Sequence, residues 1–441
     1  MKAILLTAGE GSRLDPFTPL RPKSVLPLAN RPLIRYLVWF LKEAGIREIG
    51  VVVGYKGEMV REVVDGMGDG EVQVSYFVQD PLEGPVGALR AARAFVEGPM
   101  LVMCADSFFP PAMVKEVIAR HEAGETACTL ACGPTERPLY HFKAEADERG
   151  MLRGMVRVEA KQQFRSEDIV CGLAVFEPEV FERIGCYDRP GSEWEGLMLQ
   201  LAEEGAVGLC RSEREFVDMD YPWEIGPANG LAIRHRFERR GPYISDKVCI
   251  HESVVLEGTN VIEDDVVIEP WCFIRNSWIG KGSKVLAHSY LQSAFFGEGC
   301  EIGPQCFVNG GTAGEGSHIG YNTSYKAVGL GRVGFWHECH IIGVWDDGSG
   351  ASGNCMCTGS RADGATIRMK IKGELVDSGL LNLNPMIGQG VELQAGAKVM
   401  PGRKMGHHSV AGPGMIVYHD VPPHTLLIAR PEVEVRQIPN S

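Results

Sequence analysis

The stretch IGQGVELQAGAKVMPGRKMGHHSVAGPGMIV, residues 387–417, carries an apolar side chain at every sixth position. These positions are Ile387, Leu393, Val399, Met405, Ala411 and Val417. Helices repeat at about 3.6 residues and strands at about 2, so neither explains a sustained longer period. A parallel β-solenoid does, because each repeat forms one short strand and turn with its apolar residue pointing inward. The C-terminal half is therefore predicted to be a β-helix of stacked coils.

An earlier stretch keeps the same step between apolar residues. Its positions are Val261, Val267, Phe273, Ile279, Val285 and Leu291. The period slips by one before Phe296 and is poorly kept from about residue 310 to 386. We expect loops inserted between coils over 310–386, and loops on a rigid scaffold often carry function. The alternative is a glycine-rich excursion without a site.

The N-terminal half alternates strand and helix patterns up to about residue 235. Residues 2–7 and 100–104 are buried-strand runs, whereas residues 32–44 carry apolar side chains at helical spacing. This order predicts a Rossmann-like α/β fold in which helices cover a mostly parallel sheet. The expected parts are an α/β domain at 1–230, a connecting helix at 231–242, the β-helix at 243–422 and a tail at 423–441.

Composition places the chain among globular proteins. It has 441 residues, 44% of them hydrophobic, and a net charge of -13. The acidic balance argues against a nucleic-acid surface, and no apolar run approaches the roughly 20 residues of a membrane span. The first residues lack the basic region and cleavage site of a signal peptide. Thirteen cysteines without paired spacing are expected to be reduced. We therefore expect a cytoplasmic protein with no nucleic-acid or membrane partner.

The segment LLTAGEGSRLDPFTPLRPK, residues 5–23, predicts an anion-binding loop. Gly9 and Gly11 let backbone N–H groups approach an anion without Cβ clashes. Arg13 can fork onto phosphate oxygens, and Lys23 can act as a mobile point charge. Glycines also serve tight turns, so a structural turn with surface cations is the alternative.

This segment resembles the signature of the sugar-1-phosphate nucleotidylyltransferases. That signature reads glycine, any residue, glycine, Thr or Ser, then Arg, with Lys ten residues after the Arg, and every position matches. The resemblance covers most of the chain, because many members carry a left-handed β-helix. The chain is similar in particular to archaeal and bacterial bifunctional enzymes that pair nucleotidylyl transfer with amino-sugar acetylation. The resemblance implies that the substrate is bound by Thr7, Ala8, Gly9, Gly11 and Ser12.

Two aspartates match the metal ligands of this family. Asp106 ends the buried strand in LVMCADSF, residues 101–108, and Asp218 lies in FVDMDYPWEIGPAN, residues 216–229. Two carboxylates beside substrate phosphates suit Mg²⁺, which keeps several of its waters. Asp220 stands where relatives often have Gly, as a spare carboxylate or a competitor for the metal. For Asp106 the alternative is a strand-end Asp that caps a turn.

Further matches concern the base and the sugar. Gln79 and Gly84 match residues that read a pyrimidine base, since a Gln amide both donates and accepts hydrogen bonds. Glu159 and Lys161, in VEAKQ, resemble an element that touches sugar hydroxyls and phosphate. Gly172 matches a further substrate-binding position. The sugar pocket departs most from the family pattern, which leaves the sugar unidentified.

The resemblance implies an in-line reaction. A sugar-1-phosphate oxygen attacks the α-phosphorus of a nucleoside triphosphate, and pyrophosphate leaves. The protein positions two anions and neutralises their charge without a covalent nucleophile. Arg13 would bind pyrophosphate, Lys23 the α-phosphate and Lys161 the sugar phosphate. Asp106 and Asp218 would hold Mg²⁺.

The solenoid carries a less complete pattern for acetyl transfer from acetyl-CoA. His337, in FWHECH, matches the catalytic base of the bifunctional relatives, but His340 replaces their Tyr and Gly359 their Asn. His288 in a regular coil is a second candidate base. A lone His on a solenoid is more often structural. The favoured role of the solenoid is assembly, since β-helices of this family pack side by side as homotrimers.

Three functions remain open. The leading one is a Mg²⁺-dependent nucleotidyltransferase that converts UTP or dTTP and a sugar-1-phosphate into an NDP-sugar. The second adds acetylation of an amino-sugar phosphate. The third, a catalytically silent regulatory subunit that binds a sugar nucleotide, is disfavoured because Arg13, Lys23, Asp106 and Asp218 are all present. Metal-dependent pyrophosphate release separates the first from the third, and acetyl-CoA-dependent thiol release separates the first from the second.

Overall fold

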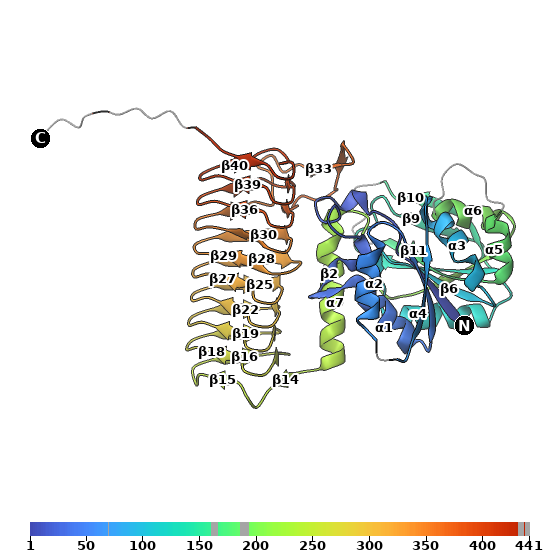
Figure 1. The fold of residues 1–441 in the computed structure, drawn as a ribbon, viewed down its shortest axis with the longest axis horizontal. Helices are drawn as coiled ribbons and strands as arrows, with labels where there is room; N and C mark the ends of the chain where they lie inside the picture. The colour runs from blue at the N-terminus through green and yellow to red at the C-terminus, as the bar shows by residue number, and fades with distance from the viewer. Residues whose placement is uncertain (69, 160–165, 186–193, 431–435, 437–441) are drawn as a thin grey trace, which may run out of the picture. The chain divides into compact units, whose positions relative to one another are not determined.

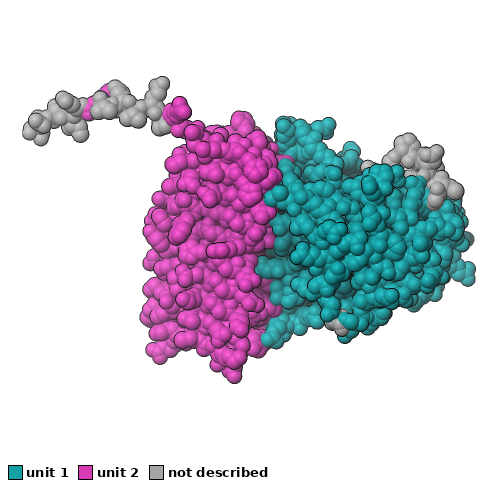
Figure 2. Space-filling view, in the orientation of Figure 1, with its two compact units in different colours: residues 1–241, 368–380 teal, residues 242–367, 381–441 magenta. Residues whose placement is uncertain are grey.

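The protein folds into two compact units (Figure 2). The first unit comprises residues 1–241 together with 368–380, and the second comprises 242–367 and 381–441. The computed structural model describes residues 1–68, 70–159, 166–185, 194–430 and 436.

The expected boundaries differ from this division at two places. The connecting helix expected at 231–242 is the end of a longer helix, α7 (Ile225–Arg240), which belongs to the first unit. The first unit also includes residues 368–380, which lie inside the stretch expected to be β-helix. The chain therefore leaves the second unit and returns to it.

The first unit is an α/β domain (Figure 1). Its central strands run in the order β6–β1–β4–β5, and each of these pairings is parallel. Strands β11, β9 and β10 extend the sheet beyond β6 with antiparallel pairings, and β8 joins β11 to β12. The strands are β1 (Lys2–Leu6), β4 (Glu48–Val53), β5 (Gln73–Val78), β6 (Met100–Cys104), β8 (Cys128–Thr135), β9 (Phe142–Ala146), β10 (Leu152–Arg157), β11 (Ser166–Phe176) and β12 (Val207–Arg211).

Helices of this unit present apolar stripes to the sheet. In α1, for example, the buried positions Ile34, Leu37 and Leu41 recur at steps of three and four, which is the spacing of one helix face. The other helices are α2 (Gly57–Asp65), α3 (Gly84–Ala91), α4 (Pro111–Glu122), α5 (Pro178–Gly185) and α6 (Trp194–Glu203), and α1 spans Leu33–Glu43. Among the described residues, no helix is long and apolar enough to cross a bilayer.

The carboxyl ends of β1 and β6 lie side by side, since Leu6 is paired with Cys104. The glycine-rich segment follows β1, and Asp106 follows β6. Parallel α/β sheets bind ligands at this edge, so the register brings the two predicted site segments together.

The second unit is a solenoid of stacked coils with short parallel strands (Figure 1). A regular coil contains three short strands, and each of them pairs in parallel with the corresponding strand of the next coil. One coil holds β17 (Val261–Ile262), β18 (Val267–Ile268) and β19 (Phe273–Arg275), and the next holds β20 (Trp278–Ile279), β21 (Lys284–Val285) and β22 (Tyr290–Gln292). This arrangement is consistent with a left-handed β-helix and confirms the expected fold class.

The inward-pointing residue is displaced by one position in the first coils. Ile268 and Ile274 are buried, whereas Val267 and Phe273, the positions expected to point inward, are only half-buried. The expectation was wrong there because both neighbours are apolar, and the sequence pattern alone does not choose between them. Coil length also varies, since Ile262 pairs with Ile279 seventeen residues later and Ile387 pairs with Met405 eighteen residues later.

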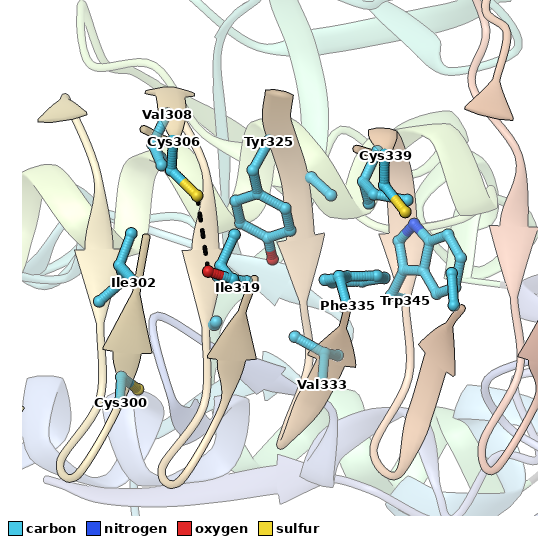
Figure 3. Close-up of a cluster of buried hydrophobic side chains, with 14 of the residues drawn as sticks. Cys300, Ile302, Cys306, Val308, Ile319, Tyr325, Val333, Phe335, Cys339 and Trp345 are labelled. Carbon is cyan, nitrogen blue, oxygen red and sulfur yellow. Dashed lines mark hydrogen bonds between the residues drawn. The ribbon is translucent and has the colours of Figure 1, made fainter. Parts of the chain in front are cut away.

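Cysteines fill the solenoid core as small apolar residues (Figure 3). The Cys306 thiol donates to the Gly320 carbonyl at 2.9 Å, and the Cys300 thiol donates to the Gly314 carbonyl at 3.1 Å. All cysteines in the described part of the chain are free thiols. Burial raises the pKa of both the Cys300 and the Cys306 thiols to about 11, so these groups stay neutral and pack like apolar side chains.

The departure from regular coils is shorter than expected. Strands continue in register through the 310–357 region, up to β32 (Met356–Cys357), and resume at β35 (Met386–Ile387). Between them the chain forms an antiparallel hairpin of β33 (Arg368–Ile371) and β34 (Glu374–Asp377). The loops expected over 310–386 are therefore concentrated after residue 357.

Candidate active site

A cavity of about 540 Å³ opens in the first unit. It is bordered by the loop after β1, the loop after β6, the start of α3 and the tip of the β33–β34 hairpin. Ten of the predicted site residues line it: Thr7, Ala8, Gly9, Gly11, Ser12, Arg13, Lys23, Gln79, Gly84 and Asp106. Segments far apart in the sequence thus converge on one space.

The glycine loop after β1, which contains Gly9 and Gly11, packs against neighbouring residues on one side and borders the cavity on the other. The Thr7 hydroxyl donates to the Val52 carbonyl at 2.6 Å, which ties the end of β1 to β4. Gly11 has a φ of 65°, and a Cβ there would lie 3.0 Å from the Cβ of Lys23. A Cβ on Gly9, in contrast, would have no atom of the described residues within 4 Å. The loop therefore needs glycine at 11 for conformation and packing, and Gly9 leaves room for a ligand.

The two predicted cations of the cavity are paired with carboxylates. Arg13 lies 2.9 Å from Asp220, between Nη1 and Oδ2. The Lys23 ammonium lies 3.2 Å from Asp106 and 3.6 Å from Asp220. Burial lowers the pKa of Lys23, but the Asp106 and Asp220 carboxylates together raise it by more, so the pKa lies above its usual value. Lys23 is therefore charged at every physiological pH.

Asp218 does not line the cavity itself, but its backbone lies next to that of Asp106. Strands β13 (Val217–Asp218) and β7 (Ser107–Phe108) pair Asp218 with Ser107, and the Met219 N–H donates to the Asp106 carbonyl at 3.0 Å. Within the described residues, the buried Oδ1 of Asp218 has no hydrogen-bond partner. Burial, then the Asp106 and Asp220 carboxylates, raise the pKa of Asp218 well above its usual range. An unpartnered buried carboxylate oxygen among like charges fits a cation ligand, and oxygen ligands are those that Mg²⁺ prefers.

His141 is a site residue whose partners the sequence did not reveal. Its Nε2 lies 3.0 Å from Glu224 Oε1, and its Nδ1 lies 4.0 Å from Asp218. Burial lowers the pKa of His141, but Glu224 and Asp218 raise it more, to about 9. The ligand atoms of His141, Asp218 and Asp220 all lie within 4.8 Å of one another. The raised pKa makes His141 a counter-charge to these carboxylates, and the three ligand atoms lie close enough together to hold a metal ion.

The amide nitrogen of Gln79 is hydrogen-bonded within the protein. Its Nε2 donates to the Gly84 carbonyl at 2.9 Å, at the start of α3. Gly87 is needed there, because a Cβ would lie 2.6 Å from that same nitrogen. The contact fixes the side chain at the cavity wall, where it can meet a ligand.

Three further predicted residues that the structure describes do not line this cavity. Gly172 packs against β6, because a Cβ would lie 2.5 Å from the Cβ of Cys104, and Glu159 is exposed away from the cavity lining. Lys161 lies outside the described residues. His337 belongs to the second unit, where its ring stacks on Tyr321 with centroids 5.0 Å apart.

Sequence reasoning missed Lys372 and left the role of Asp220 open. Asp220 lines the cavity as the shared partner of Arg13 and Lys23. Lys372 lines it from the hairpin tip. The sequence contained little sign of this hairpin, because Lys372-Gly373 is not one of the dipeptides typical of two-residue hairpin loops.

The fold is an α/β domain followed by a β-solenoid, and the cavity of the α/β domain is lined by a glycine loop, cationic side chains and carboxylates. Residues 2–210 match the nucleotidyl transferase family. The chain belongs to this family and is a nucleotidyltransferase, which confirms the resemblance seen in its motifs.

The relatives cover either somewhat more than half of the chain or nearly all of it. The low-salt glycan biosynthesis nucleotidyltransferase Agl11 of Haloferax volcanii is 30% identical over 266 residues, covering 58% of this chain and 72% of that protein. The bifunctional sugar-1-phosphate nucleotidylyltransferase/acetyltransferase of Sulfurisphaera tokodaii is 26% identical over 429 residues, 96% of this chain and 98% of that protein. The bifunctional protein GlmU of Methanococcus maripaludis is 24% identical over 467 residues, 99% of each.

Proposed function

We propose that the protein transfers a nucleotidyl group from UTP or dTTP to a sugar-1-phosphate. A phosphate oxygen of the sugar-1-phosphate forms a bond to the α-phosphorus, and the bond to the β-phosphate oxygen breaks, so that pyrophosphate leaves with the electron pair. The observation that carries this proposal is the convergence of Arg13, Lys23 and Asp106 on one cavity, with Asp218 on the strand paired with Ser107, next to Asp106. The relative from Sulfurisphaera tokodaii is named a sugar-1-phosphate nucleotidylyltransferase, which supports a sugar-1-phosphate as the acceptor.

The side chains have separable tasks in this reaction. Arg13 binds the departing pyrophosphate and Lys23 binds the α-phosphate, exchanging part of their pairing with Asp220 and Asp106 for phosphate oxygens. Asp106 and Asp218 would hold Mg²⁺, which supplies charge neutralisation at the reacting phosphates when bound. Gln79 offers its amide oxygen to the N–H edge of a pyrimidine. Lys161 is proposed to bind the sugar phosphate.

A grid assay tests the reaction class. Pyrophosphate release is measured with Mg²⁺ for UTP, dTTP, CTP, GTP and ATP, each with glucose-, N-acetylglucosamine-, glucosamine- and mannose-1-phosphate. One productive pair supports the proposal and names both substrates. Absence of turnover across the grid with a folded protein favours a regulatory subunit that binds a sugar nucleotide.

Replacing Asp218 separates activity from stability. Asp218→Asn should lower kcat by roughly 100-fold or more, because a group that stabilises transition-state charge is lost. The same change removes repulsion between Asp218 and its acidic neighbours, so without metal the free energy of unfolding should stay equal or rise. Urea unfolding in EDTA measures this free energy of unfolding without metal. Glu122→Gln, an exposed change on α4, is the matched control, and near-normal turnover of Asp218→Asn would contradict the assignment.

A second candidate activity is acetyl transfer by the solenoid. Its support is the likeness to bifunctional relatives over nearly the whole chain, together with His337, whose buried Nδ1 has no hydrogen-bond partner among the described residues. Acetyl-CoA-dependent thiol release with glucosamine-1-phosphate, abolished by His337→Ala, would support it.

The solenoid is also proposed to assemble the protein into homotrimers. Large apolar side chains are exposed along its strands and turns, and side-by-side packing would bury them. They include Val255, Trp271, Phe307 and Tyr418. Light scattering on the purified chain gives the mass that tests this proposal.

A further inference from the structure

The hairpin that interrupts the solenoid belongs to the nucleotidyltransferase unit. Its strands β33 and β34 pair Arg368 with Asp377 and Ile371 with Glu374, which leaves Lys372 and Gly373 as a two-residue loop. Their φ angles are 47° and 90°. Two positive φ values in a two-residue loop are typical of the tight hairpin turn whose twist matches that of the strands.

Lysine is an unusual choice for the first loop position. Asn, Asp or Gly adopts positive φ readily, whereas a long side chain with a Cβ is disfavoured there. A residue held in a disfavoured conformation often has a functional reason. The feature to explain is therefore the side chain that the turn carries.

The base of the hairpin is fixed to the loops around the site. Met369 is fully buried, and the Tyr140 hydroxyl donates to the Asp377 carbonyl at 2.8 Å. The Tyr140 ring lies 5.6 Å from the Tyr221 ring, and the Arg13 guanidinium lies 5.9 Å from the Tyr221 ring centroid. The hairpin is thus attached to the same aromatic contacts that border Arg13.

Lys372 supplies the cavity with a cation that no described residue neutralises. Of the residues that the structure describes, three cationic side chains line the cavity: Arg13, Lys23 and Lys372. The first two are paired with Asp220 and Asp106. Lys372 forms no ion pair with any residue that the structure describes. Its charge is therefore available to an anionic ligand, and the cavity receives one more positive charge than the glycine loop alone provides.

We propose that Lys372 binds the β- and γ-phosphates of the nucleoside triphosphate, the part that leaves as pyrophosphate. The inference rests on the proposed function and deepens it, because it adds to the site a residue from far outside the matched family region at 2–210. Lys372 contacts the phosphates equally before and during the transfer, so it contributes binding more than rate.

The test compares three full-length variants. Lys372→Ala should raise the KM for the nucleotide about tenfold with kcat nearly unchanged, the size expected for one charge-assisted contact at a partly open site. Lys372→Arg should keep most of the affinity. Lys370→Ala removes an exposed lysine from the same hairpin that does not line the cavity, and it should behave as wild type.

Calorimetric titration with Mg²⁺-pyrophosphate gives a readout that does not need turnover. Lys372→Ala should weaken pyrophosphate binding by a similar factor, whereas Lys370→Ala should not, and unfolding midpoints check that all variants are folded. Equal pyrophosphate affinity in wild type and Lys372→Ala overturns the inference. A wild-type chain that binds pyrophosphate through Lys372 but transfers no nucleotide contradicts the proposed function and leaves the inference standing. A wild-type chain that binds no pyrophosphate overturns both.

Discussion

His235 is a titratable residue enclosed by aromatic rings. It lies on α7, with ring centroids 4.6 Å from Trp39 and 5.1 Å from Phe40. Its Nε2 is buried and, in the described part of the chain, has no hydrogen-bond partner. Burial, and then the positive charge of Arg239, lower its pKa to about 4. The folded state therefore holds His235 neutral.

This depressed pKa makes stability depend on pH. An unfolded histidine takes up a proton near its usual pKa of 6.5, whereas folded His235 resists protonation down to about pH 4. The unfolded state thus binds more protons between these values, and stability falls as the pH falls through this window. We expect His235→Phe to lose less stability than wild type between pH 7 and pH 5. Urea midpoints at both values measure this, and parallel losses in the two proteins would contradict it.

The glycine loop shows which parts of the site are predictable at the residue scale. Gly9, Gly11, Arg13 and Lys23 lie within one short segment, so their spacing already carries the geometry. The role of Gly172 was not predictable in this way, because a glycine can make room either for a ligand or for a neighbouring side chain. Only the short distance to Cys104 in the structure shows that Gly172 serves packing. The pairing of His141 with Glu224 depends on segments that the sequence separates widely.

Coils of the solenoid approach so closely that single turns tolerate only glycine. A Cβ on Gly320 would lie 1.2 Å from the carbonyl oxygen of Trp336 in the following coil. A Cβ on the neighbouring Gly334, on β29 (Val333–Phe335), would have nothing within 4 Å among the described residues. The two glycines, one in the turn after β27 (His318–Ile319) and one on β29, thus form a matched pair within the solenoid.

Alanine at these two glycines should have very different effects. Gly320→Ala should lower the free energy of unfolding by about 3 kcal/mol or more, because backbone must move to relieve the overlap. Gly334→Ala should change it by less than about 0.5 kcal/mol, as for other substitutions without new contacts. Urea unfolding followed by circular dichroism measures both. Similar losses in the two variants would show that coil stacking is not the cause.

The period of the solenoid was readable from sequence because one apolar residue per strand must face inward. The prediction of the inward-facing residue was wrong where a strand carries two adjacent apolar residues, as at Val267-Ile268 and Phe273-Ile274. The hairpin β33–β34 could be expected only as an interruption, since its attachment to the first unit depends on contacts with residues such as Tyr140. Local periodicity thus predicts elements better than it predicts their partners.

Each of the two units has a separate hydrophobic core. One core cluster lies in the first unit, around residues such as Val102, Leu130 and Phe176, and the other lies in the solenoid, around residues such as Ile302 and Tyr325. Separate cores predict separate unfolding transitions in calorimetry.

A ligand should move only one of these transitions. Mg²⁺-pyrophosphate at about 100 times its Kd should stabilise the first unit by about 2.7 kcal/mol and leave the solenoid transition in place. Scanning calorimetry with and without the ligand measures the shift. Movement of both transitions together would mean that the units unfold as one cooperative body.

The route of the chain limits how freely its halves can be recombined. The long segment of the first unit ends at residue 241. Joining residues 1–241 to the solenoid of a related protein would therefore be expected to replace the solenoid and to keep the nucleotidyltransferase unit intact. It would nevertheless also replace residues 368–380, which return to that unit and bring Lys372 to the cavity. Chimaeras with related solenoids should therefore inherit the donor's nucleotide affinity along with its assembly, and a faithful exchange would have to graft the hairpin back.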